Sequence, residues 1–293
     1  MLGACVPRAS TVLVSGLSGG LQLTVDATQV YFVDGAGVHA VPKTGGAAKN
    51  IADATGKPLR VAVDDTYAYW SENLGGAIMR APKDGSGSPT LVAAATQPQG
   101  VAVADGQVFW VSNEATDYNL YRAAASGGTA SVAGPFGPAH ALVTGGLQEI
   151  VTDGSSVYFA SDGAAFSLPI EADGGLGAST SIQAGAREVP AFIAARSGQY
   201  CGAWAGALAD IAGIVCSGEP PIQFMGPLQL VAPTMPACGL AYGNAGSWLI
   251  AQRDLGTGFA MSLATDQPVS MATDGPNIYL LNTAGEIRVL PLP

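Results

Sequence analysis

The sequence is poor in charge, in histidine and in long apolar runs. Charged residues make up 12% of the 293 positions, and 22 acidic residues against 12 basic ones give a net charge of −10. Nucleic acids and anionic membrane surfaces both attract basic proteins, so this balance argues against either as a partner. No apolar run reaches the length of about 18 residues that indicates a membrane-spanning helix, and we expect no transmembrane segment.

Motifs of known catalytic and cofactor sites are missing as well. The chain shows no Ser-His-Asp spacing, nucleophile elbow, HExxH sequence or phosphate-binding loop. Its glycine pairs, such as Gly45-Gly46, follow predicted strands and are interpreted as turns, because a phosphate loop has to open a helix. None of the four cysteines has the C-x-x-C spacing of a zinc or redox site. We therefore expect no cofactor and no metal, and favour a protein that is not an enzyme, with catalysis left open.

The four cysteines allow three disulfide pairings. Cys201 and Cys216 are on consecutive predicted strands, where a cross-strand disulfide is geometrically reasonable; the alternative is two buried free thiols. Cys5 follows Leu2-Gly3-Ala4, which resembles the lipidation box of a bacterial lipoprotein, although no basic and apolar signal region precedes it. Cys5 is therefore either a lipid anchor, with the natural start further upstream, or a terminal thiol, free or bonded to Cys238.

A short phrase recurs along the chain at nearly even intervals. It consists of an apolar–small–apolar triplet, an aspartate, a turn, and an aromatic residue five positions after the aspartate, as from Val61 to Trp70. The aromatic residues that mark the copies are Tyr31, Tyr69, Phe109, Tyr158, Tyr200, Trp248 and Tyr279. Their mean spacing of about 41 residues matches a four-stranded propeller blade. The sequence therefore predicts an all-β propeller.

The ends of the chain predict how the ring closes. In the second copy we expect strands at 60–64, 68–71, 77–81 and 90–94, separated by turns rich in the 40 glycines and 19 prolines. The last copy has only three strands, and the segment 11–14 resembles the fourth strand of the other copies. If this segment completes the last blade, an exposed sheet edge is removed.

We therefore predict one domain, a seven-bladed propeller of four-stranded antiparallel blades closed by the N-terminal strand. It spans residues 11–293 and follows a tail at 1–10. The sixth copy, marked by Trp248, lacks an evident fourth strand, and only 31 residues separate Trp248 from Tyr279. A six-bladed ring is the alternative.

Tyr69-Trp70-Ser71-Glu72, with Val61-Ala62-Val63-Asp64 before it and Ile78-Met79-Arg80-Ala81-Pro82 after it, resembles the repeat of YWTD-type propellers and their bacterial relatives. YWTD propellers of this type occur in the low-density-lipoprotein receptor. The resemblance covers most of the chain, with Ser71-Glu72 in place of Thr-Asp. It implies a propeller that binds proteins or other ligands without catalysis. The family is usually six-bladed, so the blade number is not carried over.

The repeated aspartates and aromatic residues have structural interpretations. Calcium requires six to eight oxygens that converge on one point, whereas equivalent residues of separate blades are spread around a ring. We therefore interpret Asp26, Asp64, Asp153 and Asp274 as turn caps. The aromatic residues of the second strands are expected to pack between blades and not to form a carbohydrate platform.

Two sets of residues are candidates for function. Side chains that enter the first strand of each blade surround the channel mouth in propellers, and they hold a small polar ligand or form only a solvated rim. The polar ones are Gln22, Arg60, Gln99, Gln148 and Glu149. The second candidate is His140, which lies in an insertion and, with Glu149, resembles the His and Glu of antibiotic-linearising propeller lyases; the alternative is an ordinary surface loop. His39 is expected to be a solvated strand position.

The favoured function is a non-catalytic scaffold that binds a protein or saccharide through a loop face, outside the cell or in the bacterial envelope. A periplasmic or outer-membrane lipoprotein is one form of this hypothesis. The alternative is a propeller lyase or hydrolase with an acid–base pair at the channel mouth, which requires His140 and Glu149 within hydrogen-bond reach of the same substrate. A structural repeat module of a larger assembly is the third hypothesis.

Overall fold

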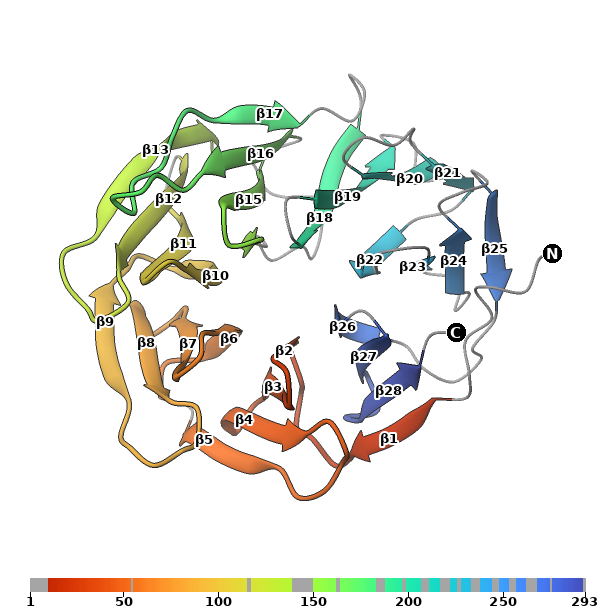
Figure 1. Ribbon diagram of the computed structural model, residues 1–293, viewed down its shortest axis with the longest axis horizontal. Coiled ribbons are helices and arrows are strands. Elements are labelled where there is room, and N and C mark those ends of the chain that lie inside the picture. Colours follow the sequence, from red (N-terminus) through yellow and green to blue (C-terminus); the bar gives the residue numbers. More distant parts are fainter. Residues whose placement is uncertain are drawn as a thin grey trace.

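The computed structural model describes the backbone of residues 10–53, 55–114, 117–138, 150–161, 164–182, 188–196, 199–206, 211–216, 222–225, 228–232, 238–243, 248–252, 257–261, 268–274 and 276–291. Side chains are described in these ranges except at 117–118, 133–138, 160–165 and 181–268. Every regular element in the described part of the chain is a β-strand. The strands form four-stranded antiparallel sheets around a central axis, which makes the protein a β-propeller (Figure 1).

Four consecutive sheets with described side chains follow the N-terminal strand, each in the order first, second, third and fourth strand from the axis outward. Blade 1 contains β2 (Gln22–Val25), β3 (Gln29–Val33), β4 (Gly37–Pro42) and β5 (Lys49–Asp53). Blade 2 contains β6 (Pro58–Val63), β7 (Tyr67–Glu72), β8 (Ala77–Pro82) and β9 (Thr90–Ala94). Blade 3 contains β10 (Pro98–Ala104), β11 (Gln107–Asn113), β12 (Asp117–Ala124) and β13 (Ser131–Pro138). Blade 4 contains β14 (Ile150–Thr152), β15 (Ser156–Ser161), β16 (Ala164–Pro169) and β17 (Thr180–Ile182).

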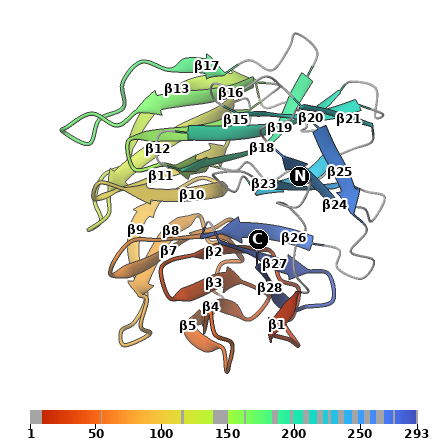
Figure 2. The same ribbon diagram turned by 45° about the vertical axis from the view of Figure 1, so that its right-hand side comes forward.

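The closing blade joins the two ends of the chain. It contains β26 (Pro268–Thr273), β27 (Asn277–Asn282), β28 (Ile287–Pro291) and, at its outer edge, β1 (Thr11–Val14). Thr11 lies opposite Val289 and Val12 opposite Arg288 in antiparallel register, and Figure 2 shows the two strands side by side. The prediction that segment 11–14 supplies the fourth strand of the last copy is confirmed.

Two further sheets lie between blade 4 and the closing blade and are described by their backbone pairing. One contains β18 (Glu188–Arg196), β19 (Gln199–Gly206), β20 (Ile211–Cys216) and β21 (Ile222–Met225); the other contains β22 (Leu228–Ala232), β23 (Cys238–Gly243), β24 (Trp248–Gln252) and β25 (Thr257–Met261). Cys201 and Cys216 lie directly opposite each other on β19 and β20. Their side chains are outside the described residues, as are Cys5 and the side chain of Cys238, so the disulfide stays a prediction.

The sequence interpretation of the sixth copy was wrong by one strand. Trp248 lies on β24, the third strand of its sheet, whereas the second strand, β23, carries Tyr242. This copy has no aspartate at the repeat position, so its second strand was assigned from the tryptophan alone. With Tyr242 as the marker, the gaps from Tyr200 and to Tyr279 become 42 and 37 residues, which are ordinary spacings. The fourth strand that was not evident is β25.

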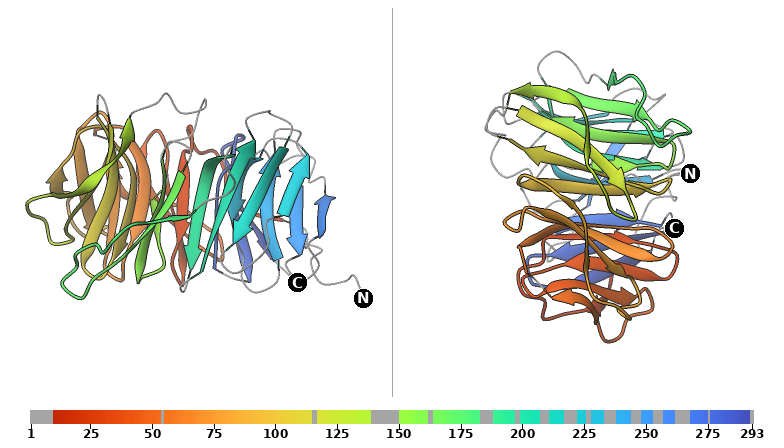
Figure 3. Two further views of the ribbon diagram at one scale, coloured as in Figure 1. Left: turned by 90° about the horizontal axis from the view of Figure 1, so that it is seen from above. Right: turned by 90° about the vertical axis from the view of Figure 1, so that its left-hand side faces the viewer.

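The core lies between neighbouring blades. In the five blades with described side chains the second strand is covered on both faces, and five of the six residues of β7 and of β27 are buried in succession. Trp70 packs with Tyr31 and Val33 of blade 1, and Trp110 packs with Tyr69 and Ile78 of blade 2. The prediction that the second-strand aromatic residues are core is confirmed at these positions. Seen from the side, the strands run between two faces of a disc (Figure 3).

Candidate functional site

The first strands of the blades surround a central cavity of about 800 Å³. The described part of its wall comes from β2, β6, β10, β14 and β26, and it combines small apolar residues such as Val25, Ala62 and Val103 with polar ones. Polar side chains lie at its two ends. We call the face where the first strands begin the mouth face, and the opposite one, with the turns that follow the first and third strands, the turn face.

Two of the predicted mouth residues line the cavity, Gln22 and Arg60. Gln22 accepts a hydrogen bond from the amide of Val61 at 2.8 Å and donates to the carbonyl of Leu23 at 2.8 Å. Its amide group therefore joins the first strands of blades 1 and 2. Arg60 is half-buried, and its guanidinium donates to the carbonyl of Leu59 at 3.2 Å. The guanidinium of Arg60 is the cationic group at this end of the described wall.

The other predicted site residues lie elsewhere. Gln99 is not part of the cavity wall; its side chain donates to the carbonyl of Gln97 at 3.1 Å. His140, Gln148 and Glu149 lie outside the described residues, so the acid–base pair and two of the five predicted mouth residues stay predictions.

The turn face carries a repeated aspartate–tyrosine unit, with a turn-capping carboxylate. Oδ1 of Asp26 accepts the amides of Thr28 and Gln29, each at 2.8 Å, and Oδ2 accepts the hydroxyl of Tyr31 at 2.9 Å. The equivalent carboxylate–hydroxyl distances are 2.7 Å for Asp64–Tyr69, 2.9 Å for Asp153–Tyr158 and 2.8 Å for Asp274–Tyr279. The prediction of turn capping is confirmed, and the fixed spacing of five residues now has a cause: the capping carboxylate also holds the tyrosine hydroxyl.

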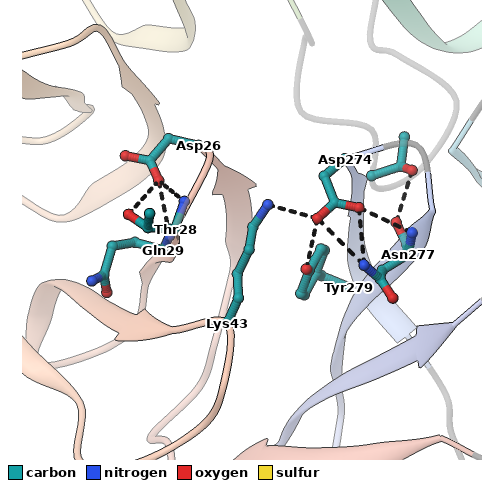
Figure 4. Close-up of polar contacts among 8 residues, drawn as sticks. Asp26, Thr28, Gln29, Lys43, Asp274, Asn277 and Tyr279 are labelled. Atoms are coloured by element: carbon teal, nitrogen blue, oxygen red, sulfur yellow. Dashed lines mark hydrogen bonds and ion pairs between the residues drawn. The ribbon is translucent and has the colours of Figure 1, made fainter.

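A lysine from the next blade completes two of these units. Lys43, at the turn after β4, lies 2.7 Å from Asp274 of the closing blade, and its ammonium is 5.1 Å from the ring centre of Tyr279 (Figure 4). Lys83, at the turn after β8, lies 2.8 Å from Asp26 in the same way. Burial alone would raise the pKa of Asp26, but hydrogen bonds from Lys83 and the turn amides outweigh burial and hold this pKa well below its usual value.

The next two blade boundaries use an arginine in the opposite direction. Ala125 in blade 3 and Ile170 in blade 4 occupy the position of the two lysines. The backbone amide at this position donates to a carbonyl in the turn between the first and second strands of the same blade, in the lysine blades and in these two alike. There Arg80 of blade 2 donates to the carbonyl of Ala125 at 2.7 Å, and Arg122 of blade 3 donates to the carbonyl of Gly174 in blade 4. Where the lysine is absent, the preceding blade thus provides a cation from its own third strand.

His39 is not the solvated position that we expected. Its side chain is 15% exposed, and its ring nitrogen lies 3.0 Å from Asp34, which also caps the turn at Ala36 and Gly37. The pair belongs to the hairpin between β3 and β4. Within the described residues, no three histidine, cysteine, aspartate or glutamate side chains converge as a metal site would require. No helix in that part of the chain is long and apolar enough to cross a membrane.

These features define an all-β propeller of four-stranded antiparallel blades with a central cavity. No protein-family model matches the chain, and no curated protein is similar to it in sequence. Among solved structures, a streptogramin B lyase is 14% identical over 99% of both chains, with a TM-score of 0.72. A catalytically inactive virginiamycin B lyase from Staphylococcus aureus with quinupristin is 13% identical over 97% of this chain and 99% of that one, with a TM-score of 0.67.

A propeller of the YWTD type, in a nidogen–laminin complex, is similar over 80% of this chain and 93% of that chain. It is 18% identical, with a TM-score of 0.53. At these identities the likeness shows the propeller fold alone, because one fold supports many functions.

Proposed function

We propose that this chain is a non-catalytic, seven-bladed binding propeller that takes a protein or saccharide at its mouth face. The five sheets with described side chains, the two backbone-described sheets and the pairing of β1 with β28 support the blade number. Residues 11–293 would then form the single domain. A location outside the cell or in the envelope, with Cys5 as a lipid anchor, is part of the same proposal.

The observation that carries the binding proposal is the position of Arg60 in a cavity of about 800 Å³ with fixed walls. Gln22 and Ser270 bind backbone amides of the adjacent first strands, so the mouth is held in place before a ligand arrives. A guanidinium at the rim of a cavity favours a carboxylate-bearing group, because it can donate two parallel hydrogen bonds to a carboxylate. An acidic saccharide or an acidic peptide segment fits this chemistry.

The test is calorimetric titration with acidic oligosaccharides, their neutral counterparts and acidic peptides. We expect the acidic probes to bind and Arg60→Ala to weaken that binding about tenfold or more, since a charged hydrogen bond contributes about 1.5–3 kcal/mol. Lys57→Ala is the matched control, because Lys57 is exposed, lies three residues away and is not part of the cavity wall. Failure of every probe to bind, or equal losses in both variants, would contradict the proposal.

A propeller lyase is the second candidate, supported by the two lyase structures that share the fold over nearly the whole chain. This hypothesis assigns His140 and Glu149 as the acid–base pair. Incubation with quinupristin, followed by mass spectrometry, tests it directly. Ring opening by the native protein that is lost in His140→Ala would replace the binding proposal with the enzymatic one.

A further inference from the structure

A buried polar residue lies at or next to the end of the second strand in four of the described blades. Glu72, Ser112 and Asn282 lie opposite the equivalent prolines Pro58, Pro98 and Pro268, and Asp34 follows the second strand of blade 1. All four are at most 5% exposed. A polar group that is removed from water needs a hydrogen-bond partner.

Three of the four residues have their partners within the protein. Asp34 accepts the amides of its own hairpin, and Asn282 accepts the amide of Glu286 at 2.9 Å. Glu72 accepts the hydroxyl of Thr55 at 2.7 Å and the indole nitrogen of Trp70 at 3.1 Å. Its carboxylate therefore joins the second strand of blade 2 to the segment that enters this blade from blade 1.

Blade 3 differs at this position. Oγ of Ser112 and Nε1 of Trp110 are buried atoms without a hydrogen-bond partner among the described residues. The two residues are two positions apart on β11, so they share a face of the strand, as Trp70 and Glu72 do on β7. Serine has three side-chain heavy atoms fewer than glutamate, and Ala95 stands where blade 2 has Thr55. Blade 3 has thus kept the tryptophan donor and lost both the carboxylate and the hydroxyl.

We propose that one buried water molecule occupies the position of this carboxylate in blade 3. It accepts a hydrogen bond from Nε1 of Trp110 and exchanges a second with the hydroxyl of Ser112. Buried waters commonly bind polar groups that would otherwise lack partners, and removing such a partner is costly. The two polar atoms on one face supply the two hydrogen-bond partners that such a water needs, and serine is smaller than glutamate at this position.

The test is water-selective NMR on ¹⁵N-labelled protein, with Trp70 as the internal control. The indole proton of Trp110 should show a cross-peak to a long-lived water, whose sign in the rotating frame separates it from proton exchange. The indole proton of Trp70, bonded to Glu72, should show none. Trp110→Phe assigns the resonance. An absent cross-peak at Trp110, or an equal one at Trp70, overturns the proposal.

A second variant tests the site from the other side. Ser112→Glu restores the carboxylate found in blade 2, so the Trp110 cross-peak should vanish and its indole proton should move toward the shift of Trp70. A cross-peak that persists unchanged in a folded Ser112→Glu variant overturns the proposal. If that variant does not fold, a native crystal structure at about 1.5 Å decides: density within hydrogen-bond distance of both atoms supports the site, and its absence refutes it.

Discussion

The ammonium of Lys43 lies 2.7 Å from the carboxylate of Asp274, and this ion pair joins residues 231 positions apart in the sequence. Both side chains are mostly buried, at 12% and 20% exposure. The pair crosses the boundary between blade 1 and the closing blade, beside which β1 also pairs with β28. The ring is therefore closed there in two ways, by a strand at its outer edge and by a side-chain ion pair near the axis.

Replacing Lys43 with methionine should destabilise the protein by about 1–2 kcal/mol. The change keeps most of the apolar stem but leaves the carboxylate of Asp274 without its cation in a partly buried site, where a charged hydrogen bond is worth more than on the surface. Urea unfolding measures the loss. Lys57→Met is the control and should change stability by less than about 0.5 kcal/mol, because Lys57 is exposed. Equal effects of the two variants would contradict the role of the pair.

The lysine and arginine contacts at the blade boundaries should be interchangeable. Arg80→Ala removes the contact between blades 2 and 3, and Ala125→Lys alone places a second cation beside Arg80 in a buried position. Both single variants should be less stable. The double variant should recover part of the loss, since the introduced lysine would reach the carboxylate of Asp64 as Lys83 reaches Asp26. A double-mutant cycle measures this coupling. If the losses of stability are simply additive, the lysine does not replace the arginine contact.

Stability should be highest between about pH 4 and pH 10 and fall on both sides. Despite burial, Lys43 and Tyr279 hold the pKa of Asp274 below its usual value, and Lys83 does the same for Asp26. Below about pH 4 these carboxylates become protonated in the unfolded chain but stay ionised in the folded protein, where their pKa is lower. Acid therefore favours unfolding. Burial and the bonded aspartates raise the pKa of Tyr31 and Tyr279, so alkali above about pH 10 favours unfolding as well.

Thermal unfolding from about pH 2 to about pH 12 covers the plateau and the fall in stability on both sides of it. Lys83→Met should make the acid limb shallower, because the folded pKa of Asp26 then moves toward its unfolded value. An acid limb as steep as that of the native protein would show that Asp26 is not coupled to Lys83. The Lys57→Met variant should reproduce the native profile on both sides.

The repeated phrase predicted much of the fold because its residues interact with others nearby in the sequence. Asp26 caps the turn that directly follows it, and Tyr31 lies on a strand buried on both faces, so both residue types recur at a fixed spacing within ten residues. The lysine contacts escaped the sequence interpretation because Lys43 and Asp274 meet only after the ring closes. Trp248 misled the strand assignment because bulk alone does not distinguish a second strand from a third.

The candidate site was less predictable, because its contacts join residues of different blades. The place of Arg60 in the cavity wall was predictable because the repeat fixes the position that enters each first strand, whereas the contact of Gln22 depends on an amide of the neighbouring blade. The proline–lysine turn after the third strand was the available signal for the ion pairs, since it occurs at Pro42-Lys43 and again at Pro82-Lys83.

Cys201 and Cys216 should form a disulfide in protein purified under oxidising conditions. Their Cα atoms are paired across two antiparallel strands, an arrangement that permits a bridge without backbone movement. Peptide mapping without reductant should show the two cysteine peptides linked, and reduction should separate them. Free thiols at both positions in oxidised protein would contradict the prediction and leave two buried apolar cysteines.

Glu72 should be required as a hydrogen-bond acceptor more than as a charge. Its carboxylate is buried beneath Gly56 and Gly75, where an added Cβ would lie 2.5 Å and 2.7 Å from Oε2, and it accepts from Thr55 and Trp70. Glu72→Ala leaves the buried indole of Trp70 without an acceptor, whereas the exposed Thr55 can bond to water, and it should destabilise the protein by about 1–3 kcal/mol. Glu72→Gln keeps an acceptor oxygen in place and should lose less than half of that. Chemical denaturation of the two variants measures the difference, with indole fluorescence and resonance shifts reporting on Trp70. If glutamine were as damaging as alanine, the ionised state of Glu72 would be what this boundary requires.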